Sequence, residues 1–576
     1  MSPFPTDRAR RLCEPLLERG WTRPQETAVI FIGEEGESEI LTVGALLEQA
    51  AACGRGLANH GLGPGDLVLL SLGHCRELLY AFWGAQLVGA VPVILPYKSP
   101  LSTQAAHAQR LLGALRQTGA RLLVTQPGQA AALAMELEEP AARVVSTERL
   151  AADAGLVARG EFAAWPGLPP DGEAIAYVQF TSGTTGSQKM VELSQRAVCS
   201  FIESLHAVLG LTPADVVVNW LPLYHDFGLF AGFIFPLLHS CPVVLISPYK
   251  WLRDPLFVLK AIQKHHGTIT LFPNSAHNHT RRCAAGLAPG SLDLSSLRLL
   301  INGSEPIRYE SQQQFLDFFS AHGLRESALA SGYGMAENTL CVTFSPPGRR
   351  CAVDWVDRMG MQESGRALPL APGSPGSAPQ VSSGRPLPGV ELAVFDPQRR
   401  PLGERCIGEI AFRSPFLFSR YRGDGAAGPG RLFEGWFFSG DLGYQADGEL
   451  YVCGRSKDLI IVGGHNIHPT AIEAVAAAQL QVSPEEVVAF GLADEALGTE
   501  RVVVVCGLRS LPGEPERASL KRAVRQRVLQ EFAVAPADVR LVRKNWLVKT
   551  QNGKIARGRT RDKYLADTAG KGEAEA

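Results

Sequence analysis

Helix-like and strand-like patterns alternate along the first 340 residues of the chain. Residues 41–60 carry apolar side chains at helical spacing, whereas residues 67–72 and 121–124 are short apolar runs that indicate buried strands. Four further strand-like runs follow helix-like segments, at residues 216–220, 242–247, 268–272 and 297–301. Alternating strands and helices form parallel sheets with helices on their faces, so this part predicts layered α/β subdomains.

The pattern changes after that point. Residues 365–389 are rich in Pro, Gly and Ser, which predicts a loop or an insertion rather than a helix or a central strand. Alternating strands at residues 390–395, 407–412 and 449–452 predict a smaller β-rich unit. The last unit has predicted helices at 469–480 and 516–531 and predicted strands at 486–490 and 502–507. It predicts a compact α+β domain, followed by a polar tail.

These changes predict the domain organisation. A large N-terminal domain covers residues 1–455, with an insertion at about 346–383 and a β-rich subdomain at about 385–455. A C-terminal cap domain covers 456–566, and residues 567–576 form a disordered tail. The length of 576 residues agrees with roughly three or four folding units.

Composition narrows the classes of function. Lys and Arg number 56 against 57 Asp and Glu, so no overall positive field attracts nucleic acid. Eleven Cys residues without a C-x-x-C pair indicate reduced, structural thiols rather than disulfides or a zinc site. The N-terminal residues lack an apolar signal segment, and charged or polar residues interrupt the most hydrophobic stretch, residues 67–96. We expect a cytoplasmic protein without a membrane span.

The sequence YVQFTSGTTGSQKMV, at residues 177–191, is the strongest chemical signal. A predicted strand leads into a loop in which Gly183 and Gly186 allow backbone N–H groups to converge on an anion, and Lys189 adds a positive charge. It is not a Walker A loop, because two residues separate Gly186 from Lys189 and Met190 follows the lysine. A Gly/Ser/Thr-rich loop alone is as often a turn or a linker, so the other motifs decide its meaning.

Those motifs together resemble the adenylate-forming superfamily of acid-activating enzymes. Besides TSGTTGSQK at 181–189, the chain contains LPLYHDFGL at 221–229, YGMAEN at 333–338, SGDLGY at 439–444, GRSKDLIIVGGHN at 454–466 and NGKIAR at 552–557. The forms LPLYHD and NGSEPIR, at 302–308, and the Pro/Gly-rich insertion are similar to the fatty acyl-AMP ligase branch. The resemblance implies a large N-terminal adenylation domain and a small mobile C-terminal domain.

The resemblance also implies roles for individual residues. ATP phosphates would be held by Thr181, Ser182, Gly183, Thr184, Thr185, Gly186 and Lys189, and Glu337 would help to bind Mg²⁺. Adenine would lie against Gly303, Ser304, Tyr333 and Gly334, and the ribose against Asp441 and Arg455. Lys554 would stabilise charge at the α-phosphate, His225 would lie between the nucleotide and the acyl pocket, and Lys457 would be the hinge.

Structural alternatives exist for several of these residues. For His225, a hydrogen-bonded core position is as compatible as the gating role. Tyr333 alone would indicate a core position, Asp441 a turn and Lys554 a solvated tail, and only the flanking motifs favour the functional roles. The aromatic and apolar residues that follow His225 and Asp226 either line an acyl tunnel or form ordinary core. They are Phe227, Leu229, Phe230, Phe233 and Phe235.

The implied reaction is the ATP-dependent conversion of a fatty or related carboxylic acid to acyl-AMP and pyrophosphate. The acyl group would then pass to the phosphopantetheine thiol of an acyl carrier protein supplied in trans. The alternatives are CoA as acceptor, an amine as acceptor, or a non-catalytic nucleotide-binding partner. GGHNIHP, at 463–469, is closer to CoA ligases and therefore weakens the argument against CoA.

Overall fold

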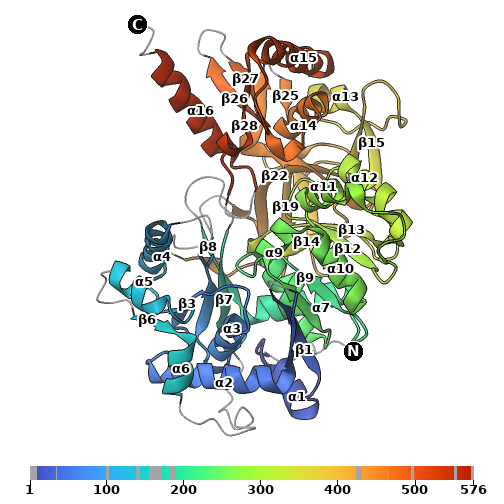
Figure 1. Ribbon diagram of the computed structural model, residues 1–576. Coiled ribbons are helices and arrows are strands. Elements are labelled where there is room, and N and C mark those ends of the chain that lie inside the picture. Colours follow the sequence, from blue (N-terminus) through green and yellow to red (C-terminus); the bar gives the residue numbers. More distant parts are fainter. Residues whose placement is uncertain are drawn as a thin grey trace.

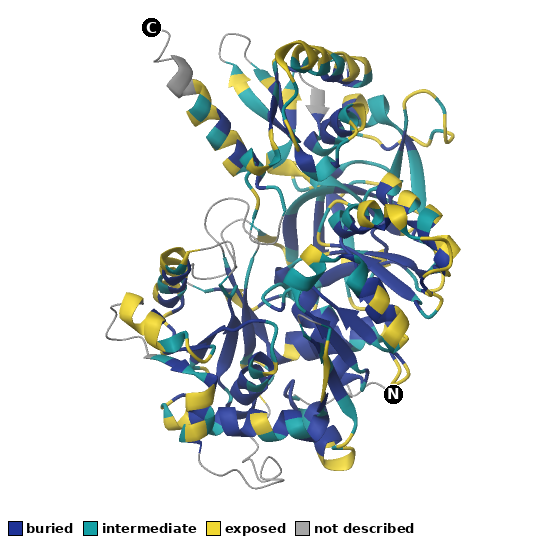
Figure 2. Cartoon of the chain, in the orientation of Figure 1, coloured by how far each residue is buried: buried dark blue, intermediate teal, exposed yellow. Residues whose placement is uncertain are grey.

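The computed structural model describes residues 10–33, 36–98, 103–137, 143–154, 171–181, 189–422, 431–462, 465–494, 499–532, 534–550 and 554–572. Two wide sheets covered by helices form the lower part of the molecule in Figure 1, and the C-terminal elements form a smaller body above them. The predicted α/β class is confirmed. Central strands and the inner faces of the helices are buried, and the outer helix faces are exposed (Figure 2).

The first sheet has seven strands in the order β20-β8-β7-β4-β3-β5-β6. Its strands are β3 (Leu67–Ser71), β4 (Val91–Ile94), β5 (Leu122–Thr125), β6 (Arg143–Ser146), β7 (Ile175–Phe180), β8 (Met190–Ser194) and β20 (Arg420–Tyr421). Strands β3 to β7 are parallel, and β8 turns back antiparallel to β7. Every residue of β3 is buried, as expected for a parallel strand covered on both faces. The accompanying helices are α2 (Val43–Asn59), α3 (Arg76–Val88), α4 (Gln104–Thr118), α5 (Ala130–Leu137) and α6 (Thr147–Asp153).

The second sheet has nine strands in the order β17-β14-β13-β12-β11-β9-β10-β1-β2. They are β1 (Thr27–Ile32), β2 (Ser38–Thr42), β9 (Val217–Asn219), β10 (Val243–Ile246), β11 (Ile269–Leu271), β12 (Leu299–Asn302), β13 (Leu329–Gly334), β14 (Cys341–Phe344) and β17 (Arg385–Pro386). Its helices are α1 (Glu14–Thr22), α8 (Phe235–Leu238), α9 (Pro248–Arg253), α10 (Leu256–His265), α11 (Asn274–Cys283) and α12 (Tyr309–Phe319). Helix α7 (Gln195–Leu209) also packs against β7 and β8 of the first sheet. A π-helix, η2 (Phe227–Ile234), leads directly into α8.

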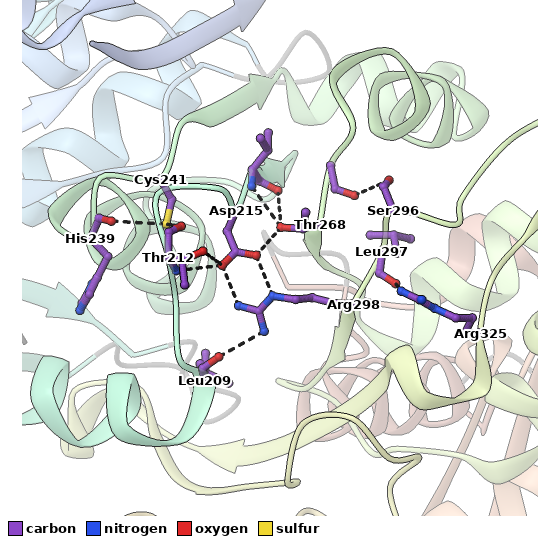
Figure 3. A network of polar contacts seen from close by, with 12 residues as sticks. Leu209, Thr212, Asp215, His239, Cys241, Thr268, Ser296, Leu297, Arg298 and Arg325 are labelled. Atoms are coloured by element: carbon purple, nitrogen blue, oxygen red, sulfur yellow. Dashed lines mark hydrogen bonds and ion pairs between the residues drawn. The ribbon is translucent and has the colours of Figure 1, made fainter. Parts of the chain in front are cut away.

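An ion pair between Asp215 and Arg298 joins the starts of β9 and β12, the strands on either side of β11 (Figure 3). Arg298 Nε and Nη2 lie 2.6 and 2.9 Å from the two carboxylate oxygens of Asp215, and Thr268 Oγ1 donates to the same carboxylate at 2.7 Å. Arg298 Nη1 also donates to the carbonyl oxygen of Leu209, the last residue of α7. The network therefore fixes the C-terminal end of α7 against the sheet.

The β-rich unit contains β18 (Glu391–Phe395), β19 (Gly408–Arg413), β21 (Leu432–Phe433), β22 (Trp436–Ala446) and β23 (Glu449–Arg455). The preceding insertion contains β15 (Val353–Asp357), α13 (Arg358–Ser364) and β16 (Ser377–Val381). The prediction that residues 365–389 form only loop was therefore wrong, because β16 and β17 lie within them. Proline is tolerated here because β16 belongs to a two-stranded ribbon and β17 is an edge strand.

The C-terminal elements begin with β24 (Ile460–Val462), β25 (His465–Ile467) and α14 (Pro469–Leu480). They continue with β26 (Val487–Asp494), β27 (Thr499–Leu508), α15 (Glu514–Phe532), β28 (Asp538–Arg543) and α16 (Arg557–Gly572). Ile472, Val504 and Val528 belong to a separate hydrophobic core in this part. The predicted disorder from residue 567 is wrong for residues 567–572, because α16 extends to Gly572. Residues 573–576 lie outside the described chain.

All eleven cysteines are free thiols, and most are buried, as the sequence predicts for structural residues. Among the described residues, no helix is both long and apolar enough to cross a membrane.

Candidate functional site

A cavity of about 680 Å³ lies between the two wide sheets, the β-rich unit and the C-terminal elements. It brings together most of the residues that the motifs predicted, although they are far apart in the sequence. Those lining it are Thr181, Lys189, His225, Ser304, Gly334, Glu337, Asp441, Arg455, Lys457 and Lys554. Gly303 and Tyr333 line a smaller adjoining cavity, and Ser182, Gly183, Thr184, Thr185 and Gly186 lie outside the described residues.

Thr181 and Lys189 join the ends of the hairpin formed by β7 and β8. The Thr181 N–H donates to the Lys189 carbonyl oxygen at 2.8 Å, and the Lys189 N–H donates to Thr181 Oγ1 at 3.2 Å. The Lys189 ammonium lies 4.2 Å from the ring centroid of Tyr421, on the edge strand β20. This cation–π contact holds the lysine at the cavity wall.

Tyr421 also connects Lys189 to a buried carboxylate. Its hydroxyl donates to Glu337 Oε1 at 2.6 Å, and Glu337 lies in a short 3₁₀ turn that follows β13. Within the part of the chain that the structure describes, no cluster of three or more His, Cys, Asp or Glu residues could hold a metal ion. Glu337 is the carboxylate that the YGMAEN motif assigns to a cation here.

A second, partly buried carboxylate, Asp441, lies where β22 pairs with β23. Its Oδ2 accepts a hydrogen bond of 2.8 Å from the Tyr333 hydroxyl, and Arg455 Nε lies 3.3 Å from Oδ1. Burial raises the pKa of Asp441, whereas Arg455 and the Tyr333 hydrogen bond act in the opposite direction. The adenine-stacking role of Tyr333 stays a prediction; in this structure its hydroxyl is bonded to Asp441.

Lys554 enters the cavity from the C-terminal part of the chain. A backbone hydrogen bond stabilises its position, because the Thr550 N–H donates to the Lys554 carbonyl oxygen at 2.7 Å. Burial lowers the pKa of Lys554, although the carboxylates of Glu305 and Asp226 oppose that shift. Glu305 is held by Ser275, whose N–H and hydroxyl donate to it at 2.8 and 3.0 Å.

His225 lies beside a carboxylate at the boundary between the two cavities. Its Nδ1 is 2.5 Å from Asp226 Oδ1, and Asp226 also accepts from the Phe227 N–H at the start of η2. Burial raises the pKa of Asp226, but His225, Lys554 and the Phe227 N–H outweigh it and leave the pKa low. A carboxylate that stays ionised therefore faces Lys554 and His225.

The smaller cavity, of about 50 Å³, is mostly apolar and shares Asp226, Ser304 and Gly334 with the larger one. Gly334 has to be glycine, because a Cβ there would lie 2.0 Å from the Leu340 carbonyl oxygen. Ser304 has a φ of 69°, which is uncommon for a residue other than glycine and is frequent at functional sites.

Only part of the predicted aromatic stripe lines this cavity. Phe227 is among its lining residues. Phe230 and Phe233 pack against Phe201 and Trp83 in the core. The core alternative is therefore correct for these two residues.

Sequence reasoning missed Tyr421, Asp226, Glu305 and Asn302. Asp226 and Glu305 stand inside recognised motifs, so their carboxylates could have been proposed from the sequence. Asn302 also opens the motif NGSEPIR, whereas Tyr421 carries no such signal. Tyr421 reaches the site only because β20 pairs with β8, more than 200 residues earlier.

Comparisons with known proteins agree with this geometry. Residues 17–422 match the family model described as AMP-binding enzyme. The chain is 30% identical to the long-chain-fatty-acid–AMP ligase FadD26 of Mycobacterium marinum, over 96% of this chain and 97% of the relative. It is 28% identical to the medium-chain-fatty-acid–[acyl-carrier-protein] ligase JamA of Moorena producens, over 86% and 85%.

A solved structure from a study of fatty acyl-adenylate ligases of E. coli and L. pneumophila superposes with a TM-score of 0.87. It is 28% identical, and the alignment covers 99% of this chain and 100% of that one. The family match, the shared fold and the cavity agree on one assignment: this chain belongs to the AMP-binding enzymes, the adenylate-forming superfamily, and is a ligase that uses ATP to adenylate an acid.

Proposed function

We propose that this enzyme converts a fatty or related carboxylic acid and ATP to acyl-AMP and pyrophosphate, and transfers the acyl group to an acyl carrier protein. The observation that carries the proposal is the position of Lys554. It lies in the same cavity as Lys189, Glu337 and Asp441, although it comes from the other end of the chain. One site thus contains a residue for phosphate binding, one for a cation, one for the ribose and one to stabilise charge at the α-phosphate.

The adenylation step needs positive charge at the phosphates. A carboxylate oxygen of the acid attacks the α-phosphorus of ATP, the bond to the bridging oxygen breaks, and pyrophosphate leaves. Lys554 would stabilise the charge that develops around the α-phosphorus, and Lys189 would bind the departing phosphates. Asp441 would accept hydrogen bonds from the ribose hydroxyls.

The carboxylate of Glu337 fits a Mg²⁺ ion. Mg²⁺ in phosphate-transfer sites usually keeps several waters and binds one or two protein carboxylates together with substrate phosphates. Glu337 Oε1 accepts the Tyr421 hydrogen bond, so Oε2 would be the oxygen that binds the ion. Glu337 would hold the ion, which would supply positive charge to the triphosphate.

Contacts between the insertion and the C-terminal part support a carrier protein rather than CoA as acceptor. Arg358, at the start of α13, forms an ion pair with Glu531 of α15, and its guanidinium carbon lies 5.7 Å from the ring centroid of Phe532. These contacts brace the C-terminal domain with Lys554 in the cavity, and so oppose the domain rotation that thioester formation with CoA would need. The name of JamA, an acyl-carrier-protein ligase, gives the same support. The CoA-ligase-like glycines Gly463 and Gly464 lie outside the described residues.

A basic groove on the C-terminal part would suit an acidic carrier protein. Its lining residues are Arg509, Arg543, Lys544, Asn545, Leu547 and Lys549. Lys544 forms an ion pair with Glu486, which leaves a net positive charge on the groove. Such a surface would attract an acidic protein and the phosphate of its phosphopantetheine arm.

A product assay tests the proposal. The enzyme is incubated with ATP, Mg²⁺ and a panel of carboxylic acids, with CoA, with a phosphopantetheinylated carrier protein, or with neither, and mass spectrometry identifies the products. We expect acyl-AMP without an acceptor and acyl transfer to the carrier alone. Efficient acyl-CoA formation would contradict the proposed acceptor. Absence of an adenylate with every acid would contradict the adenylation chemistry and favour a nucleotide-binding partner.

A further inference from the structure

The volume and the lining residues of the smaller cavity indicate which kind of acid the enzyme binds. This inference rests on the proposed function, because the cavity adjoins the larger one at Asp226, Ser304 and Gly334. An acid bound there would place its carboxylate at the shared wall, where ATP would lie, and its remaining atoms in the smaller cavity. The volume of about 50 Å³ accommodates roughly four water-sized groups.

One wall of this cavity contains an amide without partners. Asn302, at the end of β12, is completely buried and is among the lining residues. Neither its Nδ2 nor its Oδ1 has a hydrogen-bond partner among the described residues. Buried amides in proteins are normally hydrogen-bonded, so this side chain lacks both an acceptor and a donor that a ligand could supply.

The far wall is fixed in position. Leu205 and Leu209 of α7 line it, and the carbonyl oxygen of Leu209 accepts from Arg298 at 3.2 Å. Arg298 is in turn held by both carboxylate oxygens of Asp215 (Figure 3). Moving α7 to admit a longer chain would break this network, so the cavity favours a short acyl group.

We infer that the enzyme activates a short hydroxy acid whose hydroxyl group binds the amide of Asn302. A hydroxyl group both donates and accepts, so it satisfies Oδ1 and Nδ2 together, whereas a keto oxygen satisfies Nδ2 alone. The surrounding residues Phe227, Ile301, Leu340 and Phe344 give apolar contact to the carbon atoms. An unsubstituted acid of the same length would leave the amide unpaired, which is the situation that discriminates most strongly between substrates.

The test compares matched acids in a pyrophosphate-release assay. Unsubstituted acids of four, six, eight and twelve carbons are measured beside hydroxy acids of four and six carbons with the hydroxyl at C2, C3 or C4. For the wild type we expect the best hydroxy acid to exceed its unsubstituted counterpart by about tenfold or more in kcat/KM. A wild type that prefers the twelve-carbon acid, or that does not distinguish the matched pairs, would overturn the inference while leaving the proposed adenylation intact.

Two variants locate the effect. Asn302→Leu should lower kcat/KM for the preferred hydroxy acid by about tenfold and change that for the unsubstituted acid by less than about threefold. Leu209→Ala should raise kcat/KM for acids that are two carbons longer. Gln312→Leu is the control, because Gln312 is also a buried amide with an unpartnered Nε2 and lines neither cavity. Selectivity that is unchanged in Asn302→Leu, or that changes equally in Gln312→Leu, would contradict the assignment.

Discussion

Lys554 lines the cavity, and desolvation there lowers the pKa of its ammonium group. A buried lysine gives up its proton more readily than an exposed one, because the charged form is desolvated. The proposed role needs the charged form. The rate of adenylation by the free enzyme should therefore be highest below the lowered pKa, where Lys554 is charged, and should fall as the pH rises through that pKa.

We predict that kcat/KM for pyrophosphate release falls on the alkaline side with an apparent pKa below the ordinary lysine value of 10.5. Lys554→Ala should lower the rate by about a hundredfold or more while ATP binding is retained. Lys554→Arg should remove the alkaline decline, because the guanidinium group stays protonated. Rates are measured from pH 6 to 10.

Lys549→Ala is the matched control. Burial lowers the pKa of Lys549 as well, but this lysine lines the basic groove rather than the cavity. It should keep the wild-type pH profile in the absence of a carrier. An unchanged rate in Lys554→Ala would refute the proposed role of this residue.

Individual residues differ in how far the sequence predicts them. Lys189, Asp441 and Lys554 are recognisable because each stands in a contiguous motif, and the structure brings them to one cavity. Tyr421 becomes part of the site only through the pairing of β20 with β8, and the bonding state of Asn302 depends on everything packed around it. No local pattern carries that information.

At the level of elements, regular helices and strands agree with the periodicity of the sequence. The predicted helix at 469–480 coincides with α14, and the predicted strands at 67–72 and 297–301 correspond to β3 and β12. The failures lie where composition was the only guide. Prolines in β16 and β17 indicated loop, but edge positions need fewer backbone hydrogen bonds and accept them.

The contact between α13 and α15 should limit acyl-CoA formation, and its removal tests this. Arg358→Ala removes the ion pair to Glu531 and the contact with Phe532. A partly buried pair of this kind contributes on the order of 1 kcal/mol, which corresponds to a roughly fivefold change in an equilibrium. We expect acyl-CoA formation to rise about fivefold while pyrophosphate release without acceptor stays at the wild-type level.

Arg527→Ala is the control for that experiment. Arg527 Nη2 lies 2.7 Å from Oε1 of the same Glu531, but both residues belong to α15 and neither is part of the insertion. Its removal should leave the CoA reaction unchanged. An equal gain in both variants would show that loosening α15, rather than releasing the insertion, is responsible.

At the scale of the whole molecule, the order of the units could be predicted, but their relative position could not. The sequence separates a C-terminal unit from the sheets that precede it. It does not tell whether Lys554 faces the cavity, because that depends on contacts such as the hydrogen bonds from Asn274 to Glu485 and from Arg308 to the Thr470 carbonyl oxygen. Each unit has its own hydrophobic core, so the pattern within a unit does not determine its contacts with the other.

The basic groove should bind the carrier protein through its positive charge, and reversing that charge tests this. Replacing Arg543 and Lys549 together by Glu should raise the KM for the carrier protein by about tenfold at low salt, and the difference should shrink as ionic strength increases. Adenylation without a carrier should not change. Transfer is followed as acyl-carrier formation over a range of carrier and salt concentrations.

The exposed arginines of α15 offer a competing basic surface and therefore a control. Arg522 and Arg525 lie on the exposed side of that helix. Their replacement by Glu should leave the KM for the carrier unchanged. The opposite pattern, with an effect from α15 alone, would move the docking site away from the groove.

Asp226, Ser304 and Gly334 belong to the walls of both cavities. A ligand in either cavity thus orders atoms that the other ligand also contacts, and the two occupancies share a coupling free energy. Thermodynamic reciprocity then applies: the factor by which ATP changes the affinity for the acid equals the factor by which the acid changes the affinity for ATP. In the proposed binding mode, a substitution in the common wall should therefore change the affinity for the acid and the affinity for the nucleotide together.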